Sequence, residues 1–107
     1  MEETKRPWGE YEVIGKTKII KVKPNQRLSL QYHHLRDEYW KILSGSGKVT
    51  VGDLEKDVGV GDEIVIPREV KHRILAYSEG VEFIEIATGK VYEEDIVRIE
   101  DDYGRKF

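Results

Sequence analysis

The sequence predicts an all-β fold, and three observations support this. Short apolar or alternating runs recur along the chain, as expected of strands with one buried face. The segments between them are rich in Gly, Pro, Asn and Ser, which favour turns. About eight short strands at this spacing are more typical of a double-sheet jelly roll than of an immunoglobulin sandwich. We therefore expect a jelly-roll barrel.

The expected strands cover residues 10–15, 18–23, 27–33, 38–43, 47–52, 62–67, 71–77 and 81–87. The segment 92–104 breaks the alternation, because Ile96, Ile99 and Tyr103 recur at spacings of three and four. Acidic residues lead this segment and Gly104 could end a helical turn, so a short helix or turn is expected there. At 107 residues the chain is too short for two cores, which predicts a single domain over 1–107.

Composition excludes several classes of function. With 18 basic and 21 acidic residues the net charge is −3, which gives no general attraction to nucleic acid or to anionic membranes. The chain has no cysteine, so a metal could be held only by nitrogen and oxygen. The N-terminal residues contain no apolar signal-peptide core, and no apolar run is long enough to span a bilayer. These features predict a cytoplasmic location.

Polar residues gather on one face of the expected strand 27–33 and at the start of the next. Alternation places Ser29, Gln31 and His33 on one side, and Glu38 begins the following strand. Gln31, His33 and Glu38 should then converge at one end of the barrel. A buried carboxylate beside an imidazole needs a partner to offset desolvation, and a divalent cation can serve. His72 is the remaining candidate for a fourth ligand, because His34 should point away.

Two motifs carry a resemblance to the cupin superfamily. Gln31-x-His33-x4-Glu38-x6-Gly45 resembles the first cupin motif, with Gln in place of its usual first His, and Gly61-x5-Pro67-x4-His72 resembles the second. In the second motif, Glu69 and Ala76 replace the usual Gly and Asn. The resemblance implies a cupin double-stranded β-helix in which Gln31, His33, Glu38 and His72 hold one divalent metal ion.

A narrower resemblance covers nearly the whole chain. The blocks "RPWGEYEV" at 6–13, 21–52, "IPREVKHRI" at 66–74 and "EEDIVRIEDDYGR" at 93–105 are similar to the cupin domain of type II mannose-6-phosphate isomerases. In many relatives this domain is fused behind a mannose-1-phosphate guanylyltransferase, and no Gly-rich nucleotide loop precedes it here. Leu35 and Tyr39 stand where the family usually has histidines, outside the expected ligand set.

The resemblance implies a mannose-6-phosphate isomerase that interconverts mannose 6-phosphate and fructose 6-phosphate through a cis-enediol. Zn²⁺ would suit this chemistry because no redox step is needed, and Mn, Co, Ni or Fe could bind the same donors. The proposed catalytic residues are Arg36 and Arg105, and the proposed substrate contacts are Ser29 and Arg98. Arg36 could instead be a solvated loop charge, and Arg98 and Arg105 could instead pair with nearby acidic residues.

Two alternatives to the isomerase remain open, a non-catalytic sugar-binding metal cupin and a metal cupin dioxygenase. The missing family histidines at positions 35 and 39 favour the first. Exposed strand edges in a small cupin are commonly covered by a second copy, which predicts a homodimer.

Overall fold

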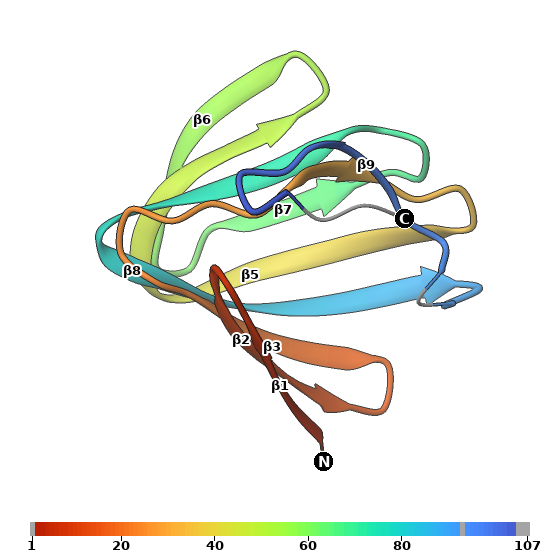
Figure 1. Ribbon diagram of the computed structural model, residues 1–107, viewed down its shortest axis with the longest axis horizontal. Helices are drawn as coiled ribbons and strands as arrows, with labels where there is room; N and C mark the ends of the chain where they lie inside the picture. Colours follow the sequence, from red (N-terminus) through yellow and green to blue (C-terminus); the bar gives the residue numbers. More distant parts are fainter. Residues whose placement is uncertain (1, 93, 105–107) are drawn as a thin grey trace.

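The computed structural model describes residues 2–92 and 94–104, and all of its regular elements there are strands (Figure 1). The strands are β1 (Glu2–Arg6), β2 (Gly9–Ile14), β3 (Thr17–Val22), β4 (Leu30–Tyr32), β5 (Arg36–Val51), β6 (Leu54–Gly59), β7 (Glu63–Ile66), β8 (His72–Gly89) and β9 (Val97–Glu100). They form one curled sheet, so the all-β prediction is confirmed.

Strands β5 and β8 are the longest and run antiparallel along their whole lengths (Figure 1). The β1–β2–β3 meander joins β8 through β3, while β6 and β7 both pair with β5. Strand β4 lies between β8 and β9. Every element is thus attached to β5 or β8 directly or through one or two neighbours.

Two pairs of expected strands are each one continuous strand in the structure. Residues 38–43 and 47–52 both belong to β5, and residues 71–77 and 81–87 both belong to β8. The turn signal between the first pair becomes a bend, with register shifts around Ser44 and Gly47. Gly45 adopts a φ of 76°, and a Cβ there would lie 2.0 Å from the Gly80 carbonyl oxygen. Only glycine fits this close approach, which lets β5 pass from β7 to β6.

The helix considered for residues 92–104 is wrong, whereas the turn is present at its end. Residues 97–100 form β9, which pairs with β4, and the amide of Gly104 donates to the carbonyl of Asp101. Arg27 donates two hydrogen bonds to Asp102, at 2.6 and 2.7 Å, and this ties the turn to the chain before β4. Backbone pairing with a distant strand therefore overrides the local helical spacing.

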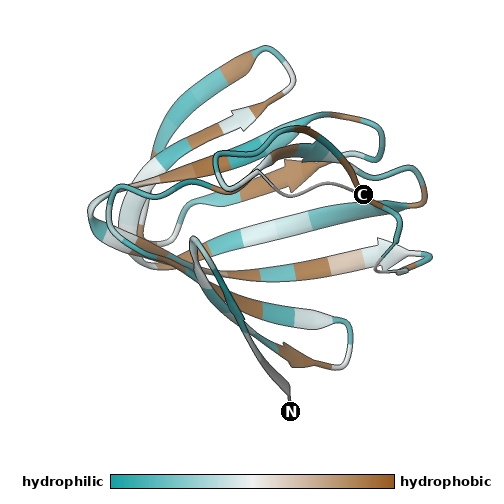
Figure 2. Ribbon diagram, viewed as in Figure 1, coloured by the Kyte–Doolittle hydropathy of each residue, from teal (hydrophilic) through white to brown (hydrophobic). Residues whose placement is uncertain are grey.

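The core lies inside the curl of the sheet. Hydrophobic and hydrophilic residues alternate along the strands in Figure 2, as the two-residue period of a strand requires. Trp40, Ile42 and Phe83 are almost fully buried, and the rings of Trp40 and Phe83 lie 4.4 Å apart. The prediction that Trp40 and Ile42 follow Glu38 inward is confirmed. In the described part of the chain, no helix is long and apolar enough to cross a membrane.

Candidate metal centre

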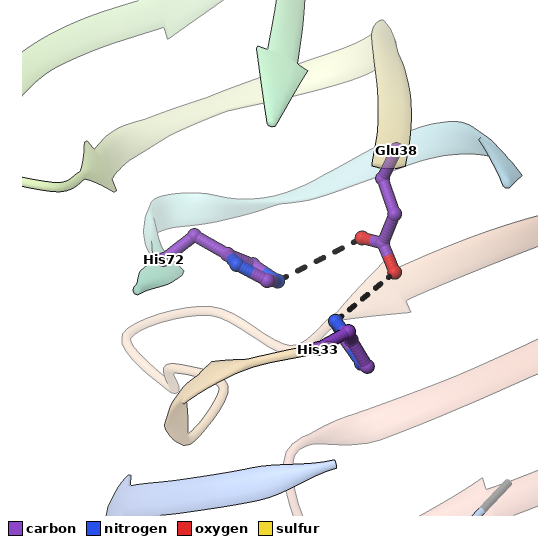
Figure 3. Close-up of side chains that lie close together, drawn as sticks. All are labelled: His33, Glu38 and His72. Atoms are coloured by element: carbon purple, nitrogen blue, oxygen red, sulfur yellow. Dashed lines mark ion pairs between the residues drawn. The ribbon is translucent and has the colours of Figure 1, made fainter. Parts of the chain in front are cut away.

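Three buried side chains from separate segments meet at one end of the core (Figure 3). His33 follows β4, Glu38 lies in β5 and His72 begins β8. One potential ligand atom from each lies within 4.8 Å of the other two. His33 Nδ1 is 3.6 Å from Glu38 Oε2, and His72 Nε2 is 3.7 Å from Glu38 Oε1. Each imidazole thus faces a different oxygen of the same carboxylate.

Strand geometry explains why these residues converge. Arg36, Glu38 and Trp40 alternate on the buried face of β5. In the β4–β8 pairing Gln31 lies opposite His72, so both side chains share one face of the sheet. The chain between β4 and β5 is fixed by Asp95, whose carboxylate accepts hydrogen bonds from the His34 and Leu35 amides, both at 2.9 Å.

The tautomer of His72 is set by its second ring nitrogen. His72 Nδ1 lies 3.0 Å from the carbonyl oxygen of Val70, which can only accept, so Nδ1 carries the proton. Nε2 then presents a lone pair toward Glu38, and this buried atom has no hydrogen-bond partner. Burial lowers the pKa of His72 below its ordinary value and keeps the ring neutral. Two lone-pair groups therefore face each other, an arrangement that a cation between them would satisfy.

Arg36 links the other two members of the cluster. Its Nε and Nη2 both lie 2.9 Å from Glu38 Oε2, and Nη2 lies 2.9 Å from His33 Nε2. A guanidinium can only donate, so His33 Nε2 accepts this hydrogen bond and Nδ1 carries the proton. Burial lowers the pKa of His33 to about 4, which leaves the ring neutral at pH 7. Arg36 is thus part of the buried site and not a solvated loop charge.

Glu38 is ionised although it is buried. Burial acts to raise its pKa, but neighbouring groups, among them the Arg36 guanidinium and the hydrogen bond to Glu85, lower it by more, so the net pKa falls below the ordinary value. Trp40 Nε1 donates to Glu38 Oε1 at 3.0 Å. The carboxylate therefore keeps its negative charge and remains available to a cation.

Glu85 is a buried carboxyl group in contact with the site, and the sequence analysis missed it. It is hydrogen bonded to Glu38, and burial followed by the nearby Glu38 charge raises its pKa to about 8. Glu85 is therefore protonated at pH 7 and donates to Glu38. A signal was available in the sequence, since Glu85 is in phase with the inward-facing Val81, Phe83 and Ala87.

The donor set fits a divalent cation. Zinc bonds to histidine nitrogen and carboxylate oxygen are about 2.0–2.2 Å long, so ligand atoms about 3–3.5 Å apart suit it. The 3.6 and 3.7 Å separations are close to this range, and the three potential ligand atoms all lie within 4.8 Å of one another. His72 Nε2 already presents its lone pair, whereas His33 Nδ1 could bind only after the ring changes tautomer, and Nε2 would then have to release the Arg36 guanidinium. The residues present thus fit an ion with two neutral ligands and one charged ligand.

Three further predicted site residues, Ser29, Gln31 and Arg98, line the same cavity as His33. Ser29 donates a hydrogen bond to Gln31 Oε1 at 2.6 Å, so the buried Ser29 hydroxyl orients the Gln31 amide. Arg98 lies opposite Gln31 in the β4–β9 pairing. His34 points away, with 51% of its side chain exposed, as expected. Arg105 lies outside the described residues.

An open cavity of about 110 Å³ adjoins the cluster. A single water needs roughly 10–15 Å³ of such space, so there is room for a small ligand and not only for an ion. The cavity is lined by Arg6, Trp8, Tyr11, Lys18, Ile20, Leu28, Ser29, Gln31, His33, Arg36, Trp40, Glu85, Ile96 and Arg98. Three of the four expected substrate and catalytic residues, Ser29, Arg36 and Arg98, therefore face one space.

The family model for the C-terminal domain of mannose-6-phosphate isomerase matches residues 1–101. The chain belongs to this family. It is 38% identical over 110 residues to mannose-1-phosphate guanylyltransferase ManC of Salmonella typhimurium, a match that covers 96% of the chain and 23% of ManC. It is 42% identical over 107 residues to the xanthan biosynthesis protein XanB of Xanthomonas campestris, with 94% and 23% covered. The chain thus spans about a quarter of the length of these relatives.

Solved structures confirm the cupin fold. An oxalate decarboxylase of Bacillus subtilis superposes with a TM-score of 0.71 at 28% identity, over 78% of this chain and 23% of that one. KdgF from Halomonas superposes with a TM-score of 0.77 over 88% and 91% of the two chains. At 13% identity, the second likeness concerns the fold alone.

The prediction that the enzyme is a mannose-6-phosphate isomerase is wrong. The relatives from Salmonella typhimurium and Escherichia coli are named mannose-1-phosphate guanylyltransferases, which are nucleotidyltransferases, and not isomerases. The error arose because the resemblance concerns a domain, while the activity in a relative's name belongs to a much longer protein. What holds for this chain is the cupin domain and its candidate metal cluster.

The raised pKa of Glu85 predicts a pH-dependent stability difference. The group titrates near 8 when folded against an ordinary value of 4.5, so its stabilising contribution is present below pH 4.5 and is lost as the pH rises toward 8. We consider the free energy of unfolding of the wild type minus that of Glu85→Gln, both measured with a metal chelator present. This difference should fall by on the order of 3–5 kcal/mol between pH 5 and 8. Urea titrations at both pH values measure this. A difference that does not change with pH contradicts a protonated Glu85.

The contacts of Arg36 predict that Arg36→Met lowers stability by an amount that depends on whether metal is bound. Without metal, the substitution leaves the Glu38 charge buried and poorly compensated, which should cost about 3–5 kcal/mol in the free energy of unfolding. With saturating Zn²⁺ this loss in the free energy of unfolding should become smaller, because the ion offsets the Glu38 charge in place of Arg36. The variant should therefore gain more stability from Zn²⁺ than the wild type does, which means that it binds Zn²⁺ more tightly.

Urea unfolding in EDTA and in Zn²⁺ tests this. Arg68→Met is the matched control, because Arg68 pairs with the exposed Asp37 and should matter by less than about 1 kcal/mol under either condition. An Arg36→Met deficit of the same size with and without Zn²⁺ would show that Arg36 does not compensate the charge of Glu38.

Proposed function

We propose that this domain binds one divalent cation and that the cation holds an oxygen of a mannose phosphate in the adjoining cavity. The ligands would be His33, Glu38 and His72, with the Gln31 amide oxygen as the fourth. The observation that carries the proposal is the His72 Nε2 lone pair, buried, without a hydrogen-bond partner and 3.7 Å from Glu38 Oε1. A buried arrangement of this kind costs free energy unless a cation lies between the two atoms.

The donor types favour Zn²⁺. Imidazole nitrogen and carboxylate oxygen suit Zn²⁺, and Mn²⁺, Co²⁺, Ni²⁺ and Fe²⁺ can bind the same set. Gln31 adds a neutral oxygen, and its orientation is fixed by the Ser29 hydroxyl. When bound, the ion would supply Lewis-acid polarisation of a ligand oxygen.

The mannose phosphate is supported by the names of the family and of the relatives. The name of the family includes mannose 6-phosphate, and the name of ManC includes mannose 1-phosphate. The residues of this chain fit such a ligand, because polar and cationic groups line the cavity beside apolar walls. Ser29 and Arg98 are proposed to contact the ligand, and Ser29 also orients Gln31 through its hydrogen bond. For this domain the proposed function is binding of the ligand.

We also propose a homodimer. Within the described residues, β6 pairs only with β5 and so presents one free backbone edge. Leu54 on β6 and Val65 on β7 are exposed large hydrophobic residues near it, at 65% and 67%. Light scattering after size exclusion should give twice the mass of the chain at micromolar concentration, and Leu54→Lys should shift it toward the monomer. A wild type that elutes as a monomer contradicts the dimer.

The metal proposal predicts stoichiometric binding that depends on His72. Isothermal titration of chelator-treated protein with Zn²⁺ should give one site, and His72→Ala should weaken it at least about 100-fold, because a ligand is removed. His34→Ala is the matched control and should bind as the wild type does, since His34 points to solvent.

A second readout guards against a variant that fails to fold. The Trp40 ring lies 5.7 Å from the His72 ring, so Zn²⁺ should change the tryptophan fluorescence of the wild type and of His34→Ala. Circular dichroism of His72→Ala should show the wild-type sheet signal. No Zn²⁺ binding by the wild type, or equal binding by His72→Ala, overturns the proposal.

A further inference from the structure

The first three strands bring a second group of polar side chains to the cavity of the metal cluster. Arg6 on β1 and Lys18 on β3 line the same space as His33 and Gln31. Both are half-buried and neither belongs to the ligand set. The meander therefore does more than extend the sheet, because it supplies one wall of the cavity.

Tyr11 on β2 organises these two cations. Arg6 Nη2 donates to the Tyr11 hydroxyl at 3.1 Å, and Arg6 Cζ lies 5.2 Å from the centre of the Tyr11 ring. Lys18 Nζ lies 4.9 Å from the same ring centre. Tyr11 in turn stacks on the buried Trp8, with ring centres 6.4 Å apart. Two long, flexible cationic side chains are thus held around one aromatic ring by cation–π attraction.

Two like charges near one ring repel each other, and an anion bound between them would reduce this repulsion. The lining of the cavity has four cationic side chains, Arg6, Lys18, Arg36 and Arg98. Among its described lining residues the one carboxyl group is Glu85, which is buried and hydrogen bonded to Glu38. The Arg36 guanidinium is already paired with Glu38. The outer cavity is therefore suited to an anionic group.

The strand order sets the separation between this group and the metal cluster. Lys18 lies opposite Glu85 in the β3–β8 pairing, and Glu85 lies opposite Trp40 in the β8–β5 pairing. Lys18 is thus two strands away from β5, which corresponds to about 10 Å across the sheet. A small molecule with an oxygen at the metal and an anionic group at its other end would span this distance.

We propose that Arg6 and Lys18, held around Tyr11, form a subsite for the phosphoryl group of the ligand. This assignment rests on the proposed function, in which the sugar end of a mannose phosphate lies at the metal. Arg6 would donate hydrogen bonds to phosphoryl oxygens and Lys18 would supply a point charge. The three-stranded meander, which carries none of the metal ligands, would then determine preference for phosphorylated over neutral sugars.

The test compares binding of inorganic phosphate, mannose 6-phosphate and mannose to the wild type, Arg6→Gln and Lys18→Met. Binding is followed by titration calorimetry and by the fluorescence of Trp8 and Trp40, which line the cavity. Lys5→Gln is the matched control, because Lys5 precedes Arg6 on β1, has a 73% exposed side chain and pairs with Glu10. Zn²⁺ affinity is measured for every variant.

Arg6→Gln and Lys18→Met should each weaken phosphate and mannose 6-phosphate binding about 10-fold, because each removes a charge-assisted contact. The two variants should bind mannose and Zn²⁺ as the wild type does, and Lys5→Gln should leave all four affinities unchanged. The subsite is overturned if the wild type binds neither phosphate nor mannose 6-phosphate, if the two variants bind them normally, or if Lys5→Gln loses as much.

The phosphate arm is run on metal-free protein, so it does not depend on the metal proposal. If the wild type binds phosphate but no Zn²⁺, and the two variants lose phosphate binding, the subsite is supported and the metal centre is rejected. Normal Zn²⁺ uptake with unchanged phosphate binding in the variants would support the metal centre and reject the subsite.

Discussion

The site depends on one constraint, that an ionised carboxylate is kept inside the core. Removing a charge from water costs several kcal/mol, and the cost is offset only by opposite charge and hydrogen bonds. Glu38 is surrounded accordingly, by the Arg36 guanidinium, the Trp40 indole N–H and the protonated Glu85. These groups come from the buried faces of β5 and β8, the two strands to which the rest of the sheet attaches.

The same constraint separates the roles of two neighbouring carboxyl groups. Glu38 and Glu85 are in contact, and the cost of two adjacent negative charges in the core keeps a proton on one of them. Glu38 is the one that ionises because the Arg36 guanidinium and the Trp40 indole N–H both donate to it. The cluster is thus close to neutral as it stands, and a divalent cation would give it the net positive charge that an anionic ligand requires.

Strand alternation made part of this site predictable from sequence. The shared face of Gln31 and His33 and the inward direction of Glu38 follow from a two-residue period, which is a local property. Glu85 was missed because a single acidic residue in a strand is usually solvent-facing, although its phase pointed inward. Strand β9 was missed for another reason, since its partner β4 lies more than sixty residues earlier and pairing at that distance leaves no local signal. The activity in the relatives' names could not be predicted from these motifs, because the chain spans only 23% of the length of ManC.

Asp95 shows where the unit that carries the site really ends. The three candidate metal ligands His33, Glu38 and His72 precede residue 73, and β8 ends at Gly89. Yet the backbone amides next to His33 are held by a carboxylate that follows β8. A protein engineer who grafted this domain and set the boundary after β8 would keep every ligand but release the loop that aims one of them. The unit that can be transferred is therefore the barrel together with the segment after β8 that contains Asp95.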